Sequence, residues 1–159
     1  MKKLNWIFYI KYVLLLFLLI FIVRLLSGSE TSSTPAAQVD ADVTSAINMD
    51  MLSAADHRMF KRLYGMNAND FENVSLYVSG SNMEVEELLI VKLKDQSQAE
   101  SVESAINTRL EKQLQSFEGY GPEQCKLLND HILDVRGNYI LFIVHNDAAA
   151  ADKAFRESL

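Results

Sequence analysis

Residues 86–94 read EELLIVKLK, and this stretch decides the fold of the chain. Its centre, Leu88-Leu89-Ile90-Val91, is apolar at four consecutive positions, so an extended strand here would be apolar on both faces. Strands in the interior of a sheet, where the faces are covered, have this pattern. The stretch therefore predicts a central strand, and the neighbouring elements should build a sheet around it.

Residues before this strand predict one helix and a second strand. Ser53 followed by Asp56 is typical of a helix N-terminal cap, and Gly65 is typical of a helix end. Between them, one helical face is apolar through Met59, Phe60, Leu63 and Tyr64. Residues 74–78, VSLYV, then alternate like a half-buried strand and end at the turn Ser79-Gly80-Ser81-Asn82.

Residues after the central strand predict two helices, a hairpin and a last helix. Ser97 and Glu100 suggest a capping box for a helix over 97–118, whose apolar residues recur at steps of three and four. Pro122 suits the first turn of a shorter helix. Residues 131–145 predict a hairpin around Gly137-Asn138, and Asn146 or Asp147 should cap an Ala-rich helix to the C-terminus. The order α-β-β-α-α-β-β-α indicates an α+β fold, a small antiparallel sheet covered by helices on one face.

An apolar run, Trp6–Leu26, lies near the N-terminus and is interrupted only by Lys11 and Arg24. A helix of that length rises roughly 30 Å, about the hydrocarbon thickness of a bilayer. Lys2 and Lys3 precede it, which predicts a cytoplasmic N-terminus and an extracytoplasmic C-terminal part. We interpret residues 1–26 as an uncleaved transmembrane helix, a signal-anchor, so that the chain contacts the membrane through residues 6–26. A cleaved secretory signal is the alternative, because small residues follow at Ser27-Gly28-Ser29.

Composition divides the remainder into a tether and one domain. Residues 27–43 are rich in Ser, Thr and Ala and predict a flexible tether, and residues 44–159 suffice for a single domain. After position 26 the chain has 11 of its 15 Lys and Arg but all 21 Asp and Glu, a net charge of −10. Such a surface repels phosphate, which disfavours nucleic-acid binding. The single cysteine, Cys125, excludes an intramolecular disulfide.

Several short motifs in this order resemble the uncharacterised bacterial domain of unknown function family 4358. They are Arg62-Leu63-Tyr64-Gly65, Met83-Glu84-Val85-Glu86-Glu87-Leu88, Val91-Lys92-Leu93-Lys94-Asp95, Arg109-Leu110, Phe117-Glu118-Gly119-Tyr120-Gly121-Pro122 and Arg136-Gly137-Asn138-Tyr139. The resemblance spans about residues 45–155 and implies an exported or membrane-anchored protein of Gram-positive bacteria. Family members often carry a lipobox cysteine, whereas Leu26-Ser27-Gly28-Ser29 has a serine there, which cannot accept the lipid. The resemblance implies no activity and supplies no catalytic residues.

The acidic cluster Glu84, Glu86 and Glu87 is the first candidate site. Glu84 and Glu86 would share one face of a strand, as carboxylates for metal or acid–base work do. The simpler interpretation is a solvated start of the strand, or a structural ion pair of Glu86 or Glu87 with Lys92, Arg109 or Arg136.

The three histidines, His57, His131 and His145, lack the spacing of a zinc motif. His131 and His145 could meet at the open end of the hairpin, although structural roles are the simpler interpretation. Cys125 is expected to be a small buried thiol, and Tyr120 and Tyr139 are expected in the core or at a rim rather than stacking on a ligand. We assign no catalytic, cofactor-binding or metal-binding residue from the sequence, and no cofactor.

The sequence thus favours a non-enzymatic, membrane-anchored extracytoplasmic binding or assembly module over an enzyme. Its working surface would be a sheet edge or a groove, and its partner a protein or a second copy of the chain. The alternatives are an extracytoplasmic hydrolase that uses carboxylates near Glu84–Glu87, and a sensor with a closed cavity for a small ligand.

Overall fold

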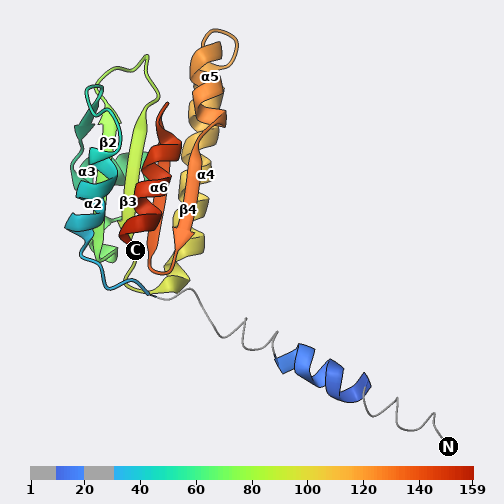
Figure 1. Ribbon diagram of the computed structural model, residues 1–159. Coiled ribbons are helices and arrows are strands. Elements are labelled where there is room, and N and C mark those ends of the chain that lie inside the picture. The colour runs from blue at the N-terminus through green and yellow to red at the C-terminus, as the bar shows by residue number, and fades with distance from the viewer. Residues whose placement is uncertain (1–9, 20–30) are drawn as a thin grey trace, which may run out of the picture. The chain divides into compact units, whose positions relative to one another are not determined.

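A five-stranded antiparallel sheet in the order β1-β2-β3-β5-β4 organises the domain (Figure 1). This computed structural model describes residues 10–19 and 31–159. The strands are β1 (Leu52–Ala54), β2 (Asn73–Ser79), β3 (Glu87–Lys92), β4 (Ile132–Arg136) and β5 (Tyr139–Val144). β3 pairs with β2 on one side and with β5 on the other, and all six of its residues are buried. The predicted central strand is confirmed.

One face of the sheet is covered by α3 (His57–Tyr64), α4 (Ala99–Phe117) and α5 (Pro122–Asn129). Leu89 and Val91 of β3 point to this face, where they meet Phe60, Ile106 and Leu128 of the three helices. Because successive side chains of a strand alternate between its faces, Leu88 and Ile90 must then be covered from the other side.

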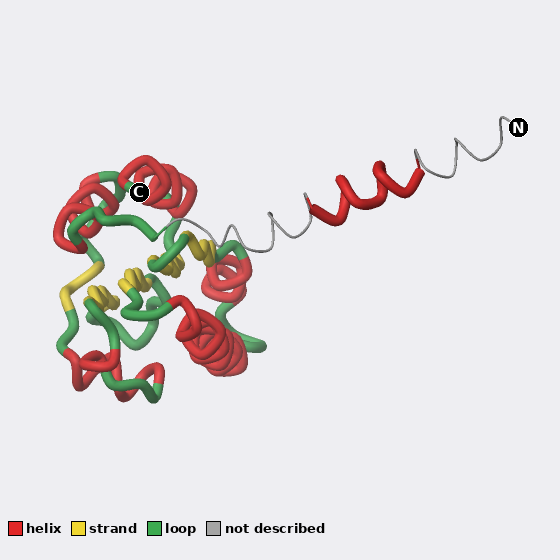
Figure 2. The backbone as a smooth tube through the Cα atoms, turned by 90° about the horizontal axis from the view of Figure 1, so that it is seen from below, coloured by secondary structure: helices red, strands yellow, loops and turns green. Residues whose placement is uncertain are grey.

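The second face is covered by α2 (Ala36–Ser45) and α6 (Ala148–Ser158), and Figure 2 shows helices on both sides of the row of strands. Leu88 and Ile90 pack there with Leu141, Ile143 and Phe155. The prediction that helices cover only one face is therefore wrong. The physical reason is that β3 and β5 are apolar at almost every position, so each of their faces needs a cover.

The second cover comes in part from residues that the sequence predicts to be a flexible tether. Of the predicted tether 27–43, residues 31–35 form no regular secondary structure and α2 begins at Ala36. Val39 and Val43, one helical turn apart, are fully buried against the sheet. The low apolar content of this stretch suggested disorder, but the spacing of its two valines provides a narrow apolar stripe. β1 was also absent from the predicted order.

The predicted helix ends hold closely, but two predicted N-terminal caps differ. The first helix does not begin at Ser53, which lies in β1; Asp56 is the N-cap and α3 begins at His57. Asp56 accepts a hydrogen bond from the Met59 N–H at 2.9 Å, and Gly65 ends α3 in the left-handed conformation with φ of 74°. The predicted Ser97–Glu100 capping box is instead formed by Asp95 and Gln98. It belongs to a short 3-10 helix, η2 (Gln96–Gln98), which leads into α4; a second 3-10 helix, η1, spans Ala68–Asp70.

The predicted membrane anchor falls largely outside the described residues. Residues 10–19 are helical, and their side chains are exposed. Within the described ranges, 10–19 and 31–159, no helix is long and apolar enough to cross a membrane. The remainder of the predicted span, residues 6–9 and 20–26, is not described.

Candidate functional site: a cleft between two helices and the sheet

Two clefts flank residues 80–86, which connect β2 to β3. The larger, here called the α3–α4 cleft, has a volume of about 610 Å³ and is lined by Ser53–Ala55, Met59, Arg62, Leu63, Val78–Asn82, Glu84, Glu86, Glu87, Arg109, Gln113, Ser116 and Phe117. The other, the α5–α6 cleft, has a volume of about 550 Å³ and is lined by Glu84–Glu86, Glu123, Gln124, Lys126, Leu127, Asp130, Ile132, His145, Asn146, Ala148 and Ala149. Both volumes fall in the range of small-ligand sites.

Glu84 and Glu86, two of the three candidate acids, line both clefts. They precede β3 rather than lying within it, because the strand begins at Glu87. Glu84 is exposed, whereas Glu86 is half-buried and its Oε1 lies 3.9 Å from Nε2 of His145. The two acids are therefore shared by two concave surfaces.

Glu87, the third acid, is buried and fully engaged. Its Oε1 accepts the hydroxyl hydrogen bond of Tyr64 at 2.5 Å, and its Oε2 accepts hydrogen bonds from Nη2 and Nε of Arg109 at 2.8 and 3.2 Å. Burial, together with the negative charge of Glu87, raises the pKa of Tyr64 well above its usual value. The interpretation of Glu87 as half of a structural ion pair with Arg109 is confirmed.

α4 brings Arg109, Gln113, Ser116 and Phe117 to the same wall of the α3–α4 cleft. Their spacing of four, three and one residues places them on one face of a helix. Gln113 is 8% exposed, and its Oε1 has no hydrogen-bond partner among the described residues. An unpaired polar atom in this position is costly, so it marks a place where a ligand could complete the hydrogen bonding.

The histidines do not meet. His131 contacts Phe142 with ring centroids 5.8 Å apart, on the face covered by α4 and α5, and its Nδ1 bonds to the Leu128 carbonyl oxygen. His145 faces the other side, where its Nε2 bonds to the carbonyl oxygen of Asn48 and its Nδ1 accepts the N–H of Asp147. His57 is exposed at the start of α3. In the described part of the chain, no group of three or more His, Cys, Asp or Glu side chains is arranged to hold a metal ion.

The remaining candidate residues have structural surroundings. Tyr139 is fully buried, as expected for a core residue, whereas Tyr120 is 62% exposed beside the ring of Phe117. Cys125 is half-buried on α5 and packs against the core. The edge strand β4 carries Asp134 and Arg136, and charges on an edge oppose the addition of a further strand. The β4 edge is thus a weaker candidate for the working surface than the α3–α4 cleft.

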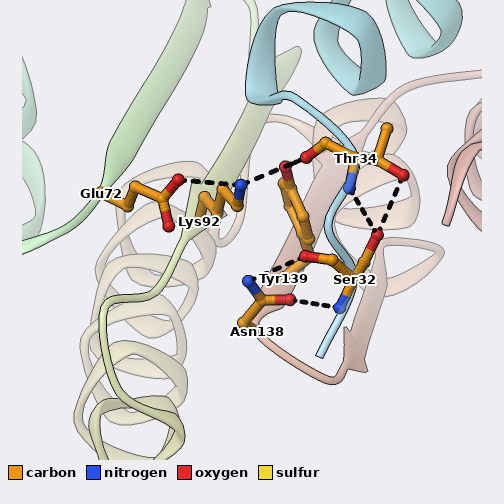
Figure 3. Close-up of polar contacts among 6 residues, drawn as sticks. All are labelled: Ser32, Thr34, Glu72, Lys92, Asn138 and Tyr139. Carbon is orange, nitrogen blue, oxygen red and sulfur yellow. Dashed lines mark hydrogen bonds and ion pairs between the residues drawn. The ribbon is translucent and has the colours of Figure 1, made fainter. Parts of the chain in front are cut away.

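At the far end of β3, residues 32–34 are fastened to the sheet (Figure 3). Ser32 and Asn138 exchange two hydrogen bonds, from the Ser32 N–H to Oδ1 and from Nδ2 to the Ser32 carbonyl oxygen, at 2.9 and 3.3 Å. The Thr34 carbonyl oxygen accepts hydrogen bonds from Tyr139 and from Lys92, and Glu72 pairs with Lys92 at 2.8 Å. We call this set of contacts the N-terminal clamp.

The sequence indicates Arg109 only as an ion-pair partner for a buried acid, and it gives no indication that Gln113 belongs to a site. Arg109 could be recognised because it is one of the few cations available to pair with a buried acid such as Glu87. Gln113 gives no such signal, because its burial depends on how α4 packs in the folded domain.

A comparison with models of protein families shows to which family the chain belongs. The profile of the domain of unknown function family DUF4358 matches residues 45–145. The chain belongs to this family. No curated protein and no solved structure matched it. All residues that line the α3–α4 cleft lie inside the DUF4358 match, whereas most of α2 and all of α6 lie outside it.

Proposed function

We propose that this DUF4358 chain is a membrane-anchored extracytoplasmic binding module that presents the α3–α4 cleft to a ligand. The observation that carries the proposal is the arrangement of β3, whose last residue, Lys92, belongs to the N-terminal clamp and whose first residue, Glu87, lines the cleft. A six-residue strand is about 17 Å long between its ends, so the clamp and the cleft lie at opposite ends of the sheet.

The clamp gives the proposed anchor a defined point of attachment. Five residues, 27–31, separate the apolar run from Ser32. The exposed apolar side chains of residues 10–19 are suited to a lipid environment, and the acidic character of the domain disfavours a second contact with anionic lipid.

Binding accounts for the cleft better than hydrolysis does. Glu87, the most buried acid, already accepts three hydrogen bonds and has no free oxygen with which to activate water. Glu84 and Glu86 do line the cleft, and this observation favours the second candidate function, a hydrolase that uses carboxylates near Glu84–Glu87. A sensor with a closed apolar cavity fits less well, because the cleft is open and lined by charged as well as apolar side chains.

Site-specific photo-crosslinking in intact cells tests the proposal on the full chain. A photoreactive phenylalanine analogue would replace Ser81 at the cleft or, as a control, Glu100, which is exposed at the start of α4. We expect a defined adduct by intact mass from position 81 and none from position 100. Equal labelling, or no adduct at either position, would contradict a binding role of the cleft.

The anchored topology needs a separate measurement. Protease added to intact cells should remove the domain, and carbonate washing of membranes should leave the full chain in the pellet. A domain that becomes accessible only after cell lysis would refute the proposed location.

A further inference from the structure

Arg109 has more hydrogen-bonding capacity than its ion pair uses. A guanidinium has five N–H donors. Glu87 takes one from Nε and one from Nη2, so three N–H groups, two of them on Nη1, have no partner among residues 10–19 and 31–159. The Arg109 side chain is 20% exposed and lines the α3–α4 cleft. The cleft thus contains a positioned cation with unused donors.

Glu87 acts on this cation and not on a ligand. The carboxylate is 1% exposed and holds Arg109 by two donors, which fixes the direction of the guanidinium plane. A buried ion pair of this kind gives little net stability compared with apolar packing. Such a pair is well suited to orienting the remaining N–H donors of Arg109.

Gln113 supplies a second, independent polar group. It follows Arg109 by one helical turn, so the two side chains are neighbours, with Cβ atoms about 6 Å apart. Gln113 is 8% exposed, and its buried side-chain oxygen lacks a partner within the described residues. Rotation about the terminal bond of the side chain exchanges oxygen and nitrogen, so the amide can turn its oxygen toward a donor in the cleft.

The rest of the cleft selects among anions. Met59, Leu63 and Phe117 provide apolar surface beside the two polar groups. Glu84, Glu86 and Glu87 line the cleft together with two cations, Arg62 and Arg109, so negative charges outnumber positive ones and disfavour ligands that carry several negative charges, such as phosphate groups. A ligand with one negative charge, an adjacent N–H donor and an apolar substituent matches this arrangement.

We propose that the α3–α4 cleft binds the C-terminal end of a peptide, with Arg109 holding the terminal carboxylate and Gln113 accepting the N–H of the last peptide bond. In such an end the carboxylate and the N–H are attached to the same Cα, so the two groups reach side chains one helical turn apart. The side chain of the last residue rests on Met59, Leu63 and Phe117. This inference rests on the proposed binding function and names the chemistry of its ligand.

The test is isothermal titration calorimetry of the full chain in detergent micelles with N-acetyl-alanyl-alanine and with its C-terminal amide. The acid should bind at least about tenfold more tightly than the amide, because a charge-assisted hydrogen bond to Arg109 is lost in the amide. Inorganic phosphate should not compete at the same concentration. Equal affinity for acid and amide, or competition by phosphate, would overturn the proposal.

Single substitutions of Gln113 and Arg109 test the two proposed ligand contacts one at a time. Gln113→Met keeps the shape of the side chain and should weaken binding of the acid about tenfold; Arg109→Lys should weaken it similarly while keeping the charge. Arg58→Gln is the control, because Arg58 is exposed and does not line this cleft. Circular dichroism would verify that each variant is folded. Undiminished binding by Gln113→Met would contradict two-point recognition even if Arg109→Lys fails to fold.

The outcomes also distinguish this inference from the proposed function. If an adduct forms at position 81 in cells but calorimetry shows no binding of the acid, the proposed binding function stands and the proposed ligand class is refuted. If neither the adduct in cells nor binding of the acid is observed, both proposals are refuted.

Discussion

Tyr139 donates its hydroxyl hydrogen bond to the backbone carbonyl oxygen of Thr34 at 2.6 Å, across 105 positions of sequence. Lys92 donates to the same oxygen at 3.2 Å and lies 5.4 Å from the centre of the Tyr139 ring. A segment that reads as a tether is thereby held on the domain by side chains from β3 and β5, the two central strands. This contact determines where the chain leaves the fold toward its N-terminal apolar run.

Replacing Tyr139→Phe should loosen the N-terminal clamp while preserving the core. The hydroxyl hydrogen bond is lost, so the free energy of unfolding should fall by about 1 kcal/mol. Hydrogen exchange of the Ser32 amide should accelerate more than that of β3. Tyr120→Phe is the matched control, because Tyr120 is exposed, and unchanged exchange at Ser32 in Tyr139→Phe would count against the clamp.

Val43→Ala tests whether α2 belongs to the core. Val43 is fully buried, and removing two carbon atoms from such a site lowers the free energy of unfolding by about 2 kcal/mol. Gln38→Ala, an exposed change in the same helix, should have almost no effect. Urea unfolding distinguishes the two, since a flexible tether would tolerate both substitutions equally.

A double-mutant cycle on Glu87 and Arg109 should show that the second change relieves the first. Arg109→Met leaves the Glu87 carboxylate buried without its cation and should cost about 3–5 kcal/mol. Adding Glu87→Gln neutralises that acid and still offers an acceptor to Tyr64, so the double variant should be more stable than Arg109→Met alone. Additive losses in denaturant titrations would mean that the pair is not coupled.

Tyr77 should make stability depend on alkaline pH. Burial and the hydrogen bond to Asp40 raise the pKa of Tyr77 to about 12, from the usual 10.0. A raised pKa in the folded state means that the neutral phenol stabilises the fold below pH 10, and that this contribution disappears as the pH rises toward about 12. The stability difference between the parent chain and Tyr77→Phe should therefore shrink over that interval. A constant difference would contradict this linkage.

Asp56 should make stability depend on acidic pH, and its contribution should be lost as the pH falls, whereas that of Tyr77 is lost as the pH rises. The hydrogen bond from the Met59 N–H, aided by Arg58, lowers the pKa of Asp56 below its usual 3.8. The capping contribution is then complete above pH 3.8 and is lost as the pH falls through the lower value in the folded state. Asp56→Asn keeps a capping oxygen without a titrating group, so this variant should lose less stability on acidification. Equal acid sensitivity in thermal unfolding would exclude the contribution.

The order of elements from α3 to α6 could be predicted from the sequence because local patterns encode it. Helical spacing, the caps at Asp56 and Gly65 and the Gly137-Asn138 turn act within a few residues. The continuous apolar run of β3 identified the centre of the sheet for the same reason. Membrane anchoring and the extracytoplasmic location follow from the Trp6–Leu26 run in the same local way and stay predictions.

Tertiary structure alone decided the role of α2 and the character of the candidate site. Val39 and Val43 become core residues only because β3 and β5 expose a second apolar face to them, and that face is assembled from distant segments. Likewise Arg109 and Gln113 lie on one face of α4, but Glu87 precedes Arg109 by 22 positions, and no spacing in the sequence joins the acid to the two helical residues. The sequence determined which elements form and in what order; packing between them determined which polar groups share a cleft, because burial depends on the neighbours that folding brings together.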